Sequence, residues 1–464
     1  MMQIKEIVLK QVKEPTTFQN VAPTFLTDDT MNKRKRQLLN RMKEEAFDTL
    51  VIYADKEHGS NFEYLTGFIP RFEEGLLVVE SSGSCTAILG NENLKLAPFS
   101  RTPVELIHSP LFSLPNQPMD NDETLEAIFK KLGFAKKNKI GIIGWKMFTT
   151  KASDSSKLFD VPHFIVQALM NAKSAQAEMY NAAYLMIGED GVRTVNNANE
   201  IAHYEYGANL ASRCMLNAMN QVEIGAKESE LGAALSAEGQ YHSVVTIAAT
   251  GKRFEMANIY PTHKQVQLAD PLSLTVGYKG GLSSRTGFAI KEEKQLPETQ
   301  KDYLDRVAKP YFRAVVSWLE GIQIGTKGKE LYQLVEETFP KKEYHWHLNP
   351  GHLVSDDEWM SSPVYIDSSQ VLKSGMIFQL DIIPSVEGYT GVSAEECVAL
   401  ADESLQEAIK MEYPALWERI SLRKNYLKNE LNIELSQDVI PLSNTVAYMR
   451  PFFLAKDLAF QVKK

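Results

Sequence analysis

An internal repeat is the feature that most constrains the fold of this chain. The segment IGAKESEL at residues 224–231 recurs as IGTKGKEL at residues 324–331, with Ile, Gly, Lys, Glu and Leu at matching places. A helix-like stretch precedes each copy, and a Tyr-His pair follows each, at residues 241–242 and 344–345. Chance similarity of two helix starts is the alternative explanation. A duplicated unit of helix and strands predicts a domain with pseudo-twofold symmetry and a cleft where the halves meet.

Strand-like runs within the repeated region are well placed to form the sheet that lines this cleft. These runs are YHSVVTIAAT, PLSLTVGY, GMIFQLDIIP and ECVALAD. Functional residues are therefore expected between residues 240 and 400. The chain beyond residue 403 is charged and helical and then rich in aromatics. That ending indicates a strand or arm that packs on the body or on a second subunit.

The first 165 residues have the pattern of an α/β domain. Residues 31–49 combine a basic run with apolar residues at helical spacing, and the apolar run TLVIYA follows. The later runs GLLVVE, CTAIL and KIGIIGW are separated by Gly, Ser and Asn, which is typical of a mixed or parallel sheet. We therefore predict domains at 1–165 and 166–403, with a C-terminal extension over 404–464 that packs on the body.

Composition and charge exclude several classes of function. The 59 acidic and 50 basic residues are spread along the chain, so no basic stripe offers a footprint for nucleic acid. Cys85, Cys214 and Cys397 show no paired spacing, so neither disulfides nor a thiolate metal site are expected. The N-terminus lacks the apolar core of a signal peptide, and no apolar run reaches the ~18 residues of a membrane span. We expect a cytoplasmic protein that binds neither nucleic acid nor membrane.

Several short motifs occur in an order that resembles a known family. NFEYLTGF at residues 61–68 resembles the N-terminal domain of aminopeptidase P, prolidase and creatinase, and NPGHL, GMIFQLDIIP and GVSAEE follow later. Together they resemble the pita-bread family, which also includes methionine aminopeptidase. The resemblance implies an α/β creatinase-like N-terminal domain followed by an α+β pita-bread domain with a pseudo-twofold internal repeat. It also implies an Xaa-Pro peptidase homologue that forms homodimers, a state that the sequence itself does not show.

The same resemblance implies a metal centre. Pita-bread metallopeptidases hold two divalent ions with two Asp, one His and two Glu side chains, and the ions activate a water against the scissile carbonyl. In this chain His352 takes the His position, and Asp381 and Glu395 take the two Glu positions. These residues are the remnant metal ligands, and His352 and Glu395 are candidate catalytic residues. In a second register His345 is the ligand and His352 the second His of the family; the distance to Asp381 favours the first.

Both Asp ligands of the family are missing. The stretch ADPLSLTVGYKGGLSSRTGF puts Thr275 at the first Asp position and Ser284 or Arg285 at the second. In the family these carboxylates neutralise two dications held close together, so without them the ions repel one another. A degenerate site is predicted, with no metal or with a single Zn, Mn or Fe ion.

Three residues are candidates for substrate binding. Asn258 stands where the family has a substrate-contacting His, and Trp359 or Met360 stands where it has a second His. Neutral Asn and apolar Trp cannot act as general acid or base near neutral pH. Arg285 is the third candidate, since a guanidinium pairs well with a carboxylate, and Arg253 is an additional one. An aromatic set suited to an apolar side chain consists of Tyr260, Tyr278, Trp346 and Trp359.

Three functions are compatible with this pattern. The first is an Xaa-Pro aminopeptidase or dipeptidase homologue that binds a peptide or small amide with little or no two-metal hydrolysis. The second is an active hydrolase on an Xaa-Pro or another C–N bond that uses one metal ion or none. The third is a protein-interaction scaffold. Metal analysis, a peptide-library assay and pull-down from lysate separate the three.

Overall fold

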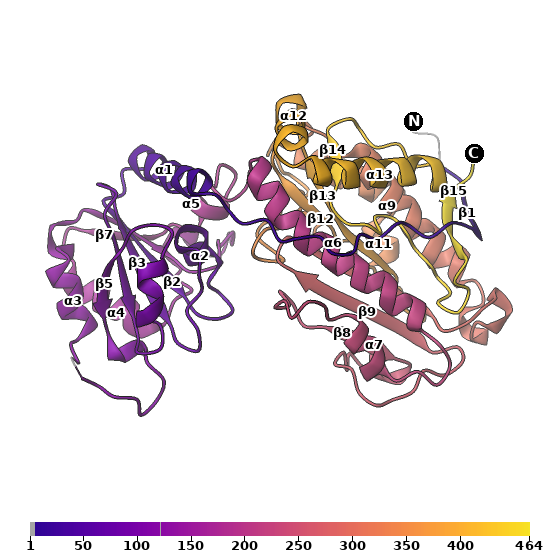
Figure 1. Cartoon of the computed structure of the whole chain (residues 1–464), viewed down its shortest axis with the longest axis horizontal. Helices are drawn as coiled ribbons and strands as arrows, with labels where there is room; N and C mark the ends of the chain where they lie inside the picture. The colour runs from indigo at the N-terminus through magenta and orange to yellow at the C-terminus, as the bar shows by residue number, and fades with distance from the viewer. Residues whose placement is uncertain (1–4, 121) are drawn as a thin grey trace. The chain divides into compact units, whose positions relative to one another are not determined.

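The chain folds into two compact units. The computed structural model describes residues 5–120 and 122–464. The small unit is Leu26–Thr194, and the large unit joins the described residues before Leu26 to Val195–Lys464 (Figure 1). Each unit has its own sheet and its own hydrophobic core, as expected for a chain of this length.

A mixed sheet forms the centre of the small unit, and it confirms the predicted α/β class. Its strands lie in the order β5-β4-β3-β2-β6-β7, with both parallel and antiparallel pairs. The strands are β2 (Thr49–Ala54), β3 (Gly75–Glu80), β4 (Cys85–Leu89), β5 (Glu105–His108), β6 (Lys139–Ile143) and β7 (Glu178–Asn181). The helices are α1 (Asp28–Glu44), α2 (Ser60–Thr66), α3 (Leu125–Lys131), α4 (His163–Ala172) and α5 (Tyr184–Ile187).

Helix α2 contains most of the NFEYLTGF motif and explains its composition. Asn61 and Tyr64 are buried, and their side chains donate to the backbone oxygens of Gly144 at 2.7 Å and Val192 at 2.7 Å. Gly67 ends the helix in the left-handed conformation with φ 79°, which favours glycine. In this protein the motif therefore anchors α2 within the small unit.

An antiparallel sheet forms the centre of the large unit, as the predicted α+β class requires. Its strands lie in the order β11-β12-β13-β10-β9-β8, and β14 pairs with β13. Within the predicted strand YHSVVTIAAT, only Ile247–Thr250 forms a strand. The ring of His242, earlier in this segment, is instead hydrogen-bonded to the side chains of Thr246 and Tyr278. The strands are β8 (Ile247–Thr250), β9 (Pro271–Tyr278), β10 (Gly281–Phe288), β11 (His352–Leu353), β12 (Ile377–Leu380), β13 (Ser393–Leu400) and β14 (Val439–Pro441).

Helices and a short two-stranded sheet complete the large unit. The helices are α6 (Ala198–Gln221), α7 (Glu228–Ala234), α8 (Lys252–Glu255), α9 (Lys309–Gly321), α10 (Gly328–Thr338), α11 (Lys341–Tyr344), α12 (Glu403–Glu412) and α13 (Pro414–Glu430). The second sheet pairs β1 (Ile7–Gln11) with β15 (Leu458–Val462).

The two copies of the repeat have the same local structure. Gly225 and Gly325 are both left-handed, with φ 92° and 89°, and their N–H groups donate to the carbonyls of Val266 and Leu372 at 2.9 Å each. In both copies the lysine forms an antiparallel bridge and then begins a helix with a capping box, in α7 and in α10. The predicted pseudo-twofold repeat is confirmed.

Helix α6 approaches the β9–β10 hairpin very closely. A Cβ atom at Gly207 would lie 1.8 Å from the Lys279 carbonyl oxygen, so only glycine fits there. Gly280, beside Lys279 in the hairpin turn, is left-handed with φ 99°. This contact holds the turn between the two strands that contain Thr275 and Ser284.

The chain termini both belong to the large unit. Strand β1 pairs with β15 from Ile7 opposite Val462 to Gln11 opposite Leu458, side by side in Figure 1. The C-terminal segment thus packs on its own chain. Contacts within one chain do not define independently folding domains, so the domain boundaries at 165 and 403 stay predictions. The homodimer also stays a prediction.

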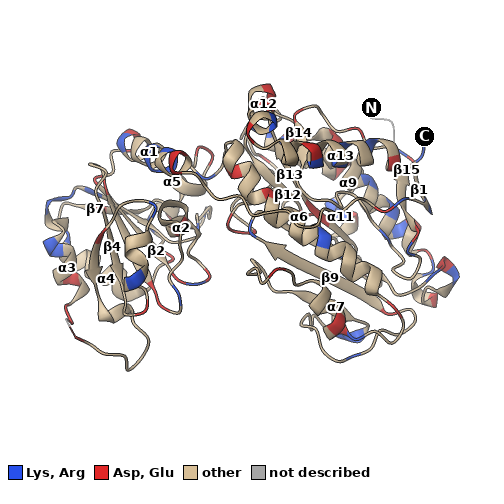
Figure 2. Cartoon of the chain, in the orientation of Figure 1, with Lys and Arg blue, Asp and Glu red and all other residues tan. Residues whose placement is uncertain are grey.

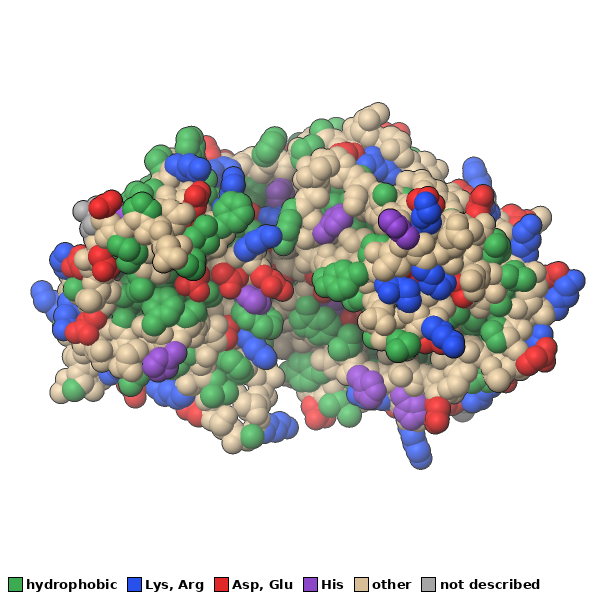
Figure 3. Space-filling model, turned by 90° about the horizontal axis from the view of Figure 1, so that it is seen from below, with side chains coloured by type: hydrophobic (Ala, Val, Ile, Leu, Met, Phe, Trp, Pro, Cys, Tyr) green, Lys and Arg blue, Asp and Glu red, His purple; other side chains and the backbone are tan. Residues whose placement is uncertain are grey.

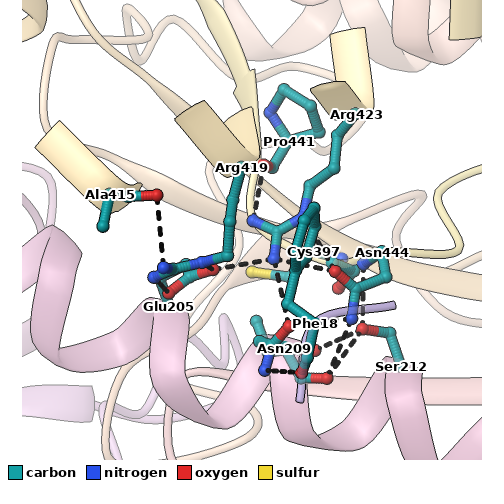
Figure 4. A network of polar contacts seen from close by, with 12 residues as sticks. Phe18, Glu205, Asn209, Ser212, Cys397, Ala415, Arg419, Arg423, Pro441 and Asn444 are labelled. Carbon is teal, nitrogen blue, oxygen red and sulfur yellow. Dashed lines mark hydrogen bonds and ion pairs between the residues drawn. The ribbon is translucent and has the colours of Figure 1, made fainter. Parts of the chain in front are cut away.

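A buried polar network ties helix α13 to helix α6. Glu205 of α6 accepts from Arg419 at 2.9 and 2.5 Å and from Arg423 at 2.7 Å (Figure 4). Arg423 also donates to the Asn444 side-chain oxygen at 3.0 and 2.8 Å, and Asn444 donates to the Asn209 side-chain oxygen at 2.9 Å. The C-terminal segment is thereby fixed to the helix that supports the β9–β10 hairpin.

Charged side chains of both signs are interspersed along each unit (Figure 2). On the face that Figure 3 displays, acidic, basic and apolar side chains are likewise mixed. Within residues 5–120 and 122–464, none of the helices combines the length and the apolar character that crossing a lipid bilayer requires.

Candidate functional site

Three of the predicted site positions form one row across the large sheet. Thr275 of β9 lies opposite Ser284 of β10, and Ser284 lies opposite Glu395 of β13. Residues directly opposite one another in a sheet point to the same side. Ser284, rather than Arg285, therefore shares a face with Thr275 and Glu395, and we call the side of the sheet that carries this row the polar face.

Hydroxyl groups fill the polar face where the family resemblance implies carboxylates. Thr275 donates to Ser284 at 2.9 Å, and Ser284 is 2.9 Å from Ser393. Ser393 is 3.2 Å from Thr286, which donates to Ser273 at 3.2 Å. The five hydroxyls thus form one continuous chain.

The direction of this hydroxyl chain follows from its two ends. Each hydroxyl has a single proton. Thr286 gives its proton to Ser273, so Ser393 must donate to Thr286, and Ser284 must then donate to Ser393. Thr275, which donates to Ser284, is left with an oxygen that can still accept.

Arg285, a predicted substrate-binding residue, is not brought to the polar face. Alternation along β10 turns it to the opposite side, where it forms an ion pair with Glu396 at 2.6 Å. Its other N–H groups donate to backbone oxygens of Tyr448, Thr445, Ser284 and Glu395. All five of its N–H groups are therefore used, and none is left for a substrate carboxylate.

The two sides of the sheet also differ in exposure. On the polar face Thr275 keeps 7% of its surface exposed and Glu395 keeps 8%. On the opposite side Arg285 and Glu396 each keep only 1%. Both sides are therefore buried, and the side that carries Arg285 and Glu396 is the more completely buried of the two.

His352 and Asp381 are brought together, and Glu358 joins them. The His352 Nε2 atom lies 3.8 Å from Asp381 Oδ2 and 3.3 Å from Glu358 Oε1. His352 is fully buried, and the Trp359 ring stacks on it with centroids 4.0 Å apart. By contrast, His345 is exposed in a left-handed conformation with φ 51°.

Burial and charge shift the pKa values of this cluster. Burial lowers the pKa of His352, but the carboxylates of Glu358 and Asp381 outweigh it, so the pKa is raised. Burial raises the pKa of Asp381 to about 6, against the opposing effect of His352. Burial, followed by the nearby charges of Asp381 and Glu358, raises the pKa of Glu395 well above its ordinary value. Burial therefore favours the neutral forms of the Asp381 and Glu395 carboxyl groups.

The donor set does not fit two metal ions. Thr275 and Ser284, which stand where the family resemblance implies Asp ligands, hydrogen-bond to each other and supply no charge. Among the described residues, no group of three or more His, Cys, Asp or Glu side chains is arranged to hold a metal ion. Two polar atoms of the cluster nevertheless lack a hydrogen-bond partner while buried, His352 Nε2 and Asp381 Oδ1.

Glu228 organises the loop that contains Asn258. Its carboxylate is fully buried and accepts from the backbone and side chain of both Thr250 and Thr262 at 2.6 to 3.1 Å. It also accepts from Arg253 at 3.0 Å, so that this arginine is engaged within the loop. Asn258 is exposed, and its backbone N–H and C=O are both hydrogen-bonded to Arg253.

Replacing Glu228 by glutamine is expected to loosen this loop. The amide nitrogen of glutamine would face N–H donors, and an unsatisfied buried donor costs about 1 to 3 kcal/mol. Hydrogen exchange at the Thr250 and Thr262 amides should then accelerate by about 10-fold or more. Glu230→Gln, on the exposed side of the same helix, is the matched control. Equal protection in both variants would contradict the role assigned to Glu228.

Of the predicted aromatic set, only Trp359 lies at the remnant cluster, and it is 38% exposed. Trp346 and Tyr278 are buried and donate to the backbone oxygens of Phe339 and Leu235. Tyr260 is 65% exposed, and its backbone oxygen accepts from Arg253. Trp346 and Tyr278 are thus core residues.

Sequence reasoning missed Glu358 and three of the hydroxyls. Glu358 lies in a loop before the buried Met360. It directly precedes Trp359, a predicted site residue, and this position in the sequence could have identified it. The hydroxyls were detectable by alternation, since Ser273 and Thr275 on one strand and Ser284 and Thr286 on the next are each two residues apart.

The fold and part of the sequence match known proteins. Residues 202–402 match the model of metallopeptidase family M24. The solved structures most like the chain include an Xaa-Pro dipeptidase from Bacillus anthracis, with 17% identity over 81% of this chain and 96% of that one and a TM-score of 0.59. They also include the prolidase from Pyrococcus horikoshii OT3, with 18% identity over 80% and 96% of the two chains and a TM-score of 0.60.

A third similar structure is the X-Pro aminopeptidase from Thermotoga maritima MSB8, with 17% identity over 80% of this chain and 95% of that one and a TM-score of 0.59. A comparison with curated protein sequences finds no match. Identities this low establish the fold alone. The chain therefore has the two-domain fold of prolidases and X-Pro aminopeptidases, and residues 202–402 form a pita-bread domain of metallopeptidase family M24.

Proposed function

We propose that this chain is an Xaa-Pro peptidase homologue that binds a peptide or small amide on its polar face and carries out little or no two-metal hydrolysis. One observation carries the proposal. The two positions where the family resemblance implies bridging Asp ligands hold Thr275 and Ser284, joined by a 2.9 Å hydrogen bond. Two neutral hydroxyls leave a pair of dications without the charge that would hold them together.

A peptide or small amide suits the groups that remain. Hydroxyls and carboxylates accept from N–H groups, and the exposed part of Trp359 offers an apolar surface beside them. The structural relatives are Xaa-Pro dipeptidases and aminopeptidases by name, which supports a peptide as the ligand class. In this proposal His352 and Glu395 bind the ligand rather than catalyse. The alternative is an active hydrolase on an Xaa-Pro or another C–N bond that uses a single divalent ion or no metal.

An assay of the full chain tests this proposal. Release of the N-terminal residue from Xaa-Pro dipeptides and longer peptides is measured after loading with Mn, Co or Zn, with metal content determined in parallel. We expect turnover at least about 10³-fold below that of an intact two-metal prolidase assayed alongside, since metal activation of water is lost. Turnover at the level of that enzyme, with two ions per chain, would overturn the proposal; turnover with one ion or with none would favour the alternative hydrolase.

A further inference from the structure

We propose that the Ser273 end of the polar face is a subsite for an uncharged amide carbonyl with an apolar side chain beside it. The subsite is bounded by Phe254 of α8, by Thr286 of β10 and by the loop residues Thr390 and Gly391. This inference rests on the proposed function and names the part of the ligand that this end of the face takes. The side chains that form the subsite are neutral, and the remnant metal ligands do not belong to it.

An apolar gap lies beside Gly391. A Cβ atom built on this glycine would lie 3.7 Å from Phe254 Cζ and 3.8 Å from the methyl carbon of Thr286, which are ordinary van der Waals distances. Phe254 and Gly391 are partly exposed, whereas Thr286 is buried. The gap is therefore accessible from outside, and the Phe254 ring and the Thr286 methyl group offer it apolar walls.

Hydroxyl groups at the same end of the face have hydrogen-bonding capacity left. Ser273 accepts from Thr286 at 3.2 Å, and its own proton goes to no partner among residues 5–120 and 122–464. Thr390 is only 8% exposed, yet its Oγ1 atom has no hydrogen-bond partner in that part of the chain. Because buried polar groups are normally hydrogen-bonded, we expect these hydroxyls to have a partner that the protein does not supply.

The direction of the hydroxyl chain fixes the kind of partner. At Thr275 the chain ends in an oxygen that can accept, whereas at Ser273 it ends in an O–H group that is free to donate. A carbonyl oxygen has two lone pairs and no proton, so it matches such a donor. A carboxylate fits less well, since the Arg253 guanidinium next to Phe254 is already paired with Glu228 at 3.0 Å.

Hydrogen bonds hold the walls of the subsite in place. The Thr390 N–H group donates to the side chain of Gln300 at 3.1 Å, and the Tyr303 hydroxyl donates to the Gly391 carbonyl at 3.2 Å. Phe254 belongs to the loop that the buried carboxylate described above organises. A ligand therefore meets a largely formed subsite, which lowers the cost of ordering the loops on binding.

Ligand-observed NMR with a matched pair of neutral probes tests the inference. The full chain, treated with EDTA, is mixed with N-acetyl-L-leucinamide, which has amide carbonyls and an apolar side chain. The second probe is N-acetylglycinamide, which has the carbonyls alone. We expect the leucine compound to bind at least about 10-fold more tightly, because its side chain leaves water for the gap beside Gly391.

Substitutions in the walls separate the polar feature from the apolar one. Thr390→Val removes the hydroxyl while keeping the shape, and it should weaken binding of the leucine probe by about 5-fold, as for one neutral hydrogen bond. Gly391→Leu fills the gap and should abolish the preference for that probe. Thr338→Val, whose hydroxyl donates to carbonyls of its own helix α10, is the matched control and should leave binding unchanged.

Melting temperatures of the variants, measured in parallel, identify any folding defect. If Gly391→Leu does not fold, Phe254→Ala removes a wall at a partly exposed position and should likewise reduce the preference. No binding of the leucine probe, equal binding of the two probes, or an unchanged preference in a folded wall variant would overturn the inference. The proposed function fails differently, through two-metal turnover of Xaa-Pro peptides, whichever probe binds.

Discussion

Replacing Glu205 by leucine is expected to lower the free energy of unfolding by about 3 to 5 kcal/mol, as found when one partner of a buried ion pair is removed. Glu205 is fully buried, and it accepts from both Arg419 and Arg423. Arg423 is itself buried, so its charge would lose its partner without gaining water. Urea unfolding of the variant and the wild type at neutral pH measures the difference.

A double substitution tests whether the loss comes from the unpaired charge. In Glu205→Leu with Arg423→Met both buried charges are gone. The hydrogen bonds of Arg423 to Asn444, Asn209 and Pro441 are lost as well, and Arg419 loses its ion pair with Glu205. This double variant should be more stable than Glu205→Leu alone, because a well-packed apolar pair can replace a buried ion pair at little cost. A double variant less stable than the single one would show that packing rather than charge dominates.

The destabilisation caused by Glu205→Leu should depend on pH, and its direction follows from the pKa of Glu205. Burial raises the pKa of Glu205, but Arg423 and Arg419 outweigh it, so the pKa in the folded state is lowered. At low pH the unfolded chain then binds more protons than the folded one, and stability rises with pH. The contribution of Glu205 is therefore complete above its unfolded pKa of about 4.3 and is lost as pH falls below it. The gap between wild type and Glu205→Leu should narrow in acid.

Local signals in the sequence were enough to predict the repeat and most strands of both sheets. The repeat was readable because Gly225 and Gly325 both need a left-handed conformation and each precedes a helix with a capping box. Strand β2 is buried along its whole length and appears as a nearly continuous apolar run, whereas β9 alternates apolar residues with Ser273 and Thr275. The predicted fold class was correct for both reasons.

Long-range contacts set the limit on predicting the site. The choice between Ser284 and Arg285 depends on the register of β9 and β10, which is set by the turn between Tyr278 and Gly281. With Lys279 and Gly280 as the two turn residues, that register was available from the sequence. The pairing of Glu205 with Arg423 was not, because no local pattern links residues so far apart in the chain.

Restoring the two missing carboxylates is expected to create metal binding. In Thr275→Asp with Ser284→Asp, the new side chains point to the polar face in the same row as Glu395. Together with His352, Asp381 and Glu395 they complete the ligand set that the family resemblance implies. Calorimetry with Mn or Zn should show that the variant binds two ions at micromolar concentrations or below. The wild type should not bind two ions under the same conditions.

Stability gives a second readout of the same variant. Without metal, two added carboxylates beside Asp381 and Glu395 repel one another, so the double Asp variant should melt below the wild type. Metal at about 100 times its Kd should restore about 2.7 kcal/mol, because it binds only the folded state. Thr275→Asn with Ser284→Asn has the same shape without the charges, and its melting temperature should not respond to metal. A folded double Asp variant that also fails to respond would mean that Thr275 and Ser284 are not the positions of the lost ligands.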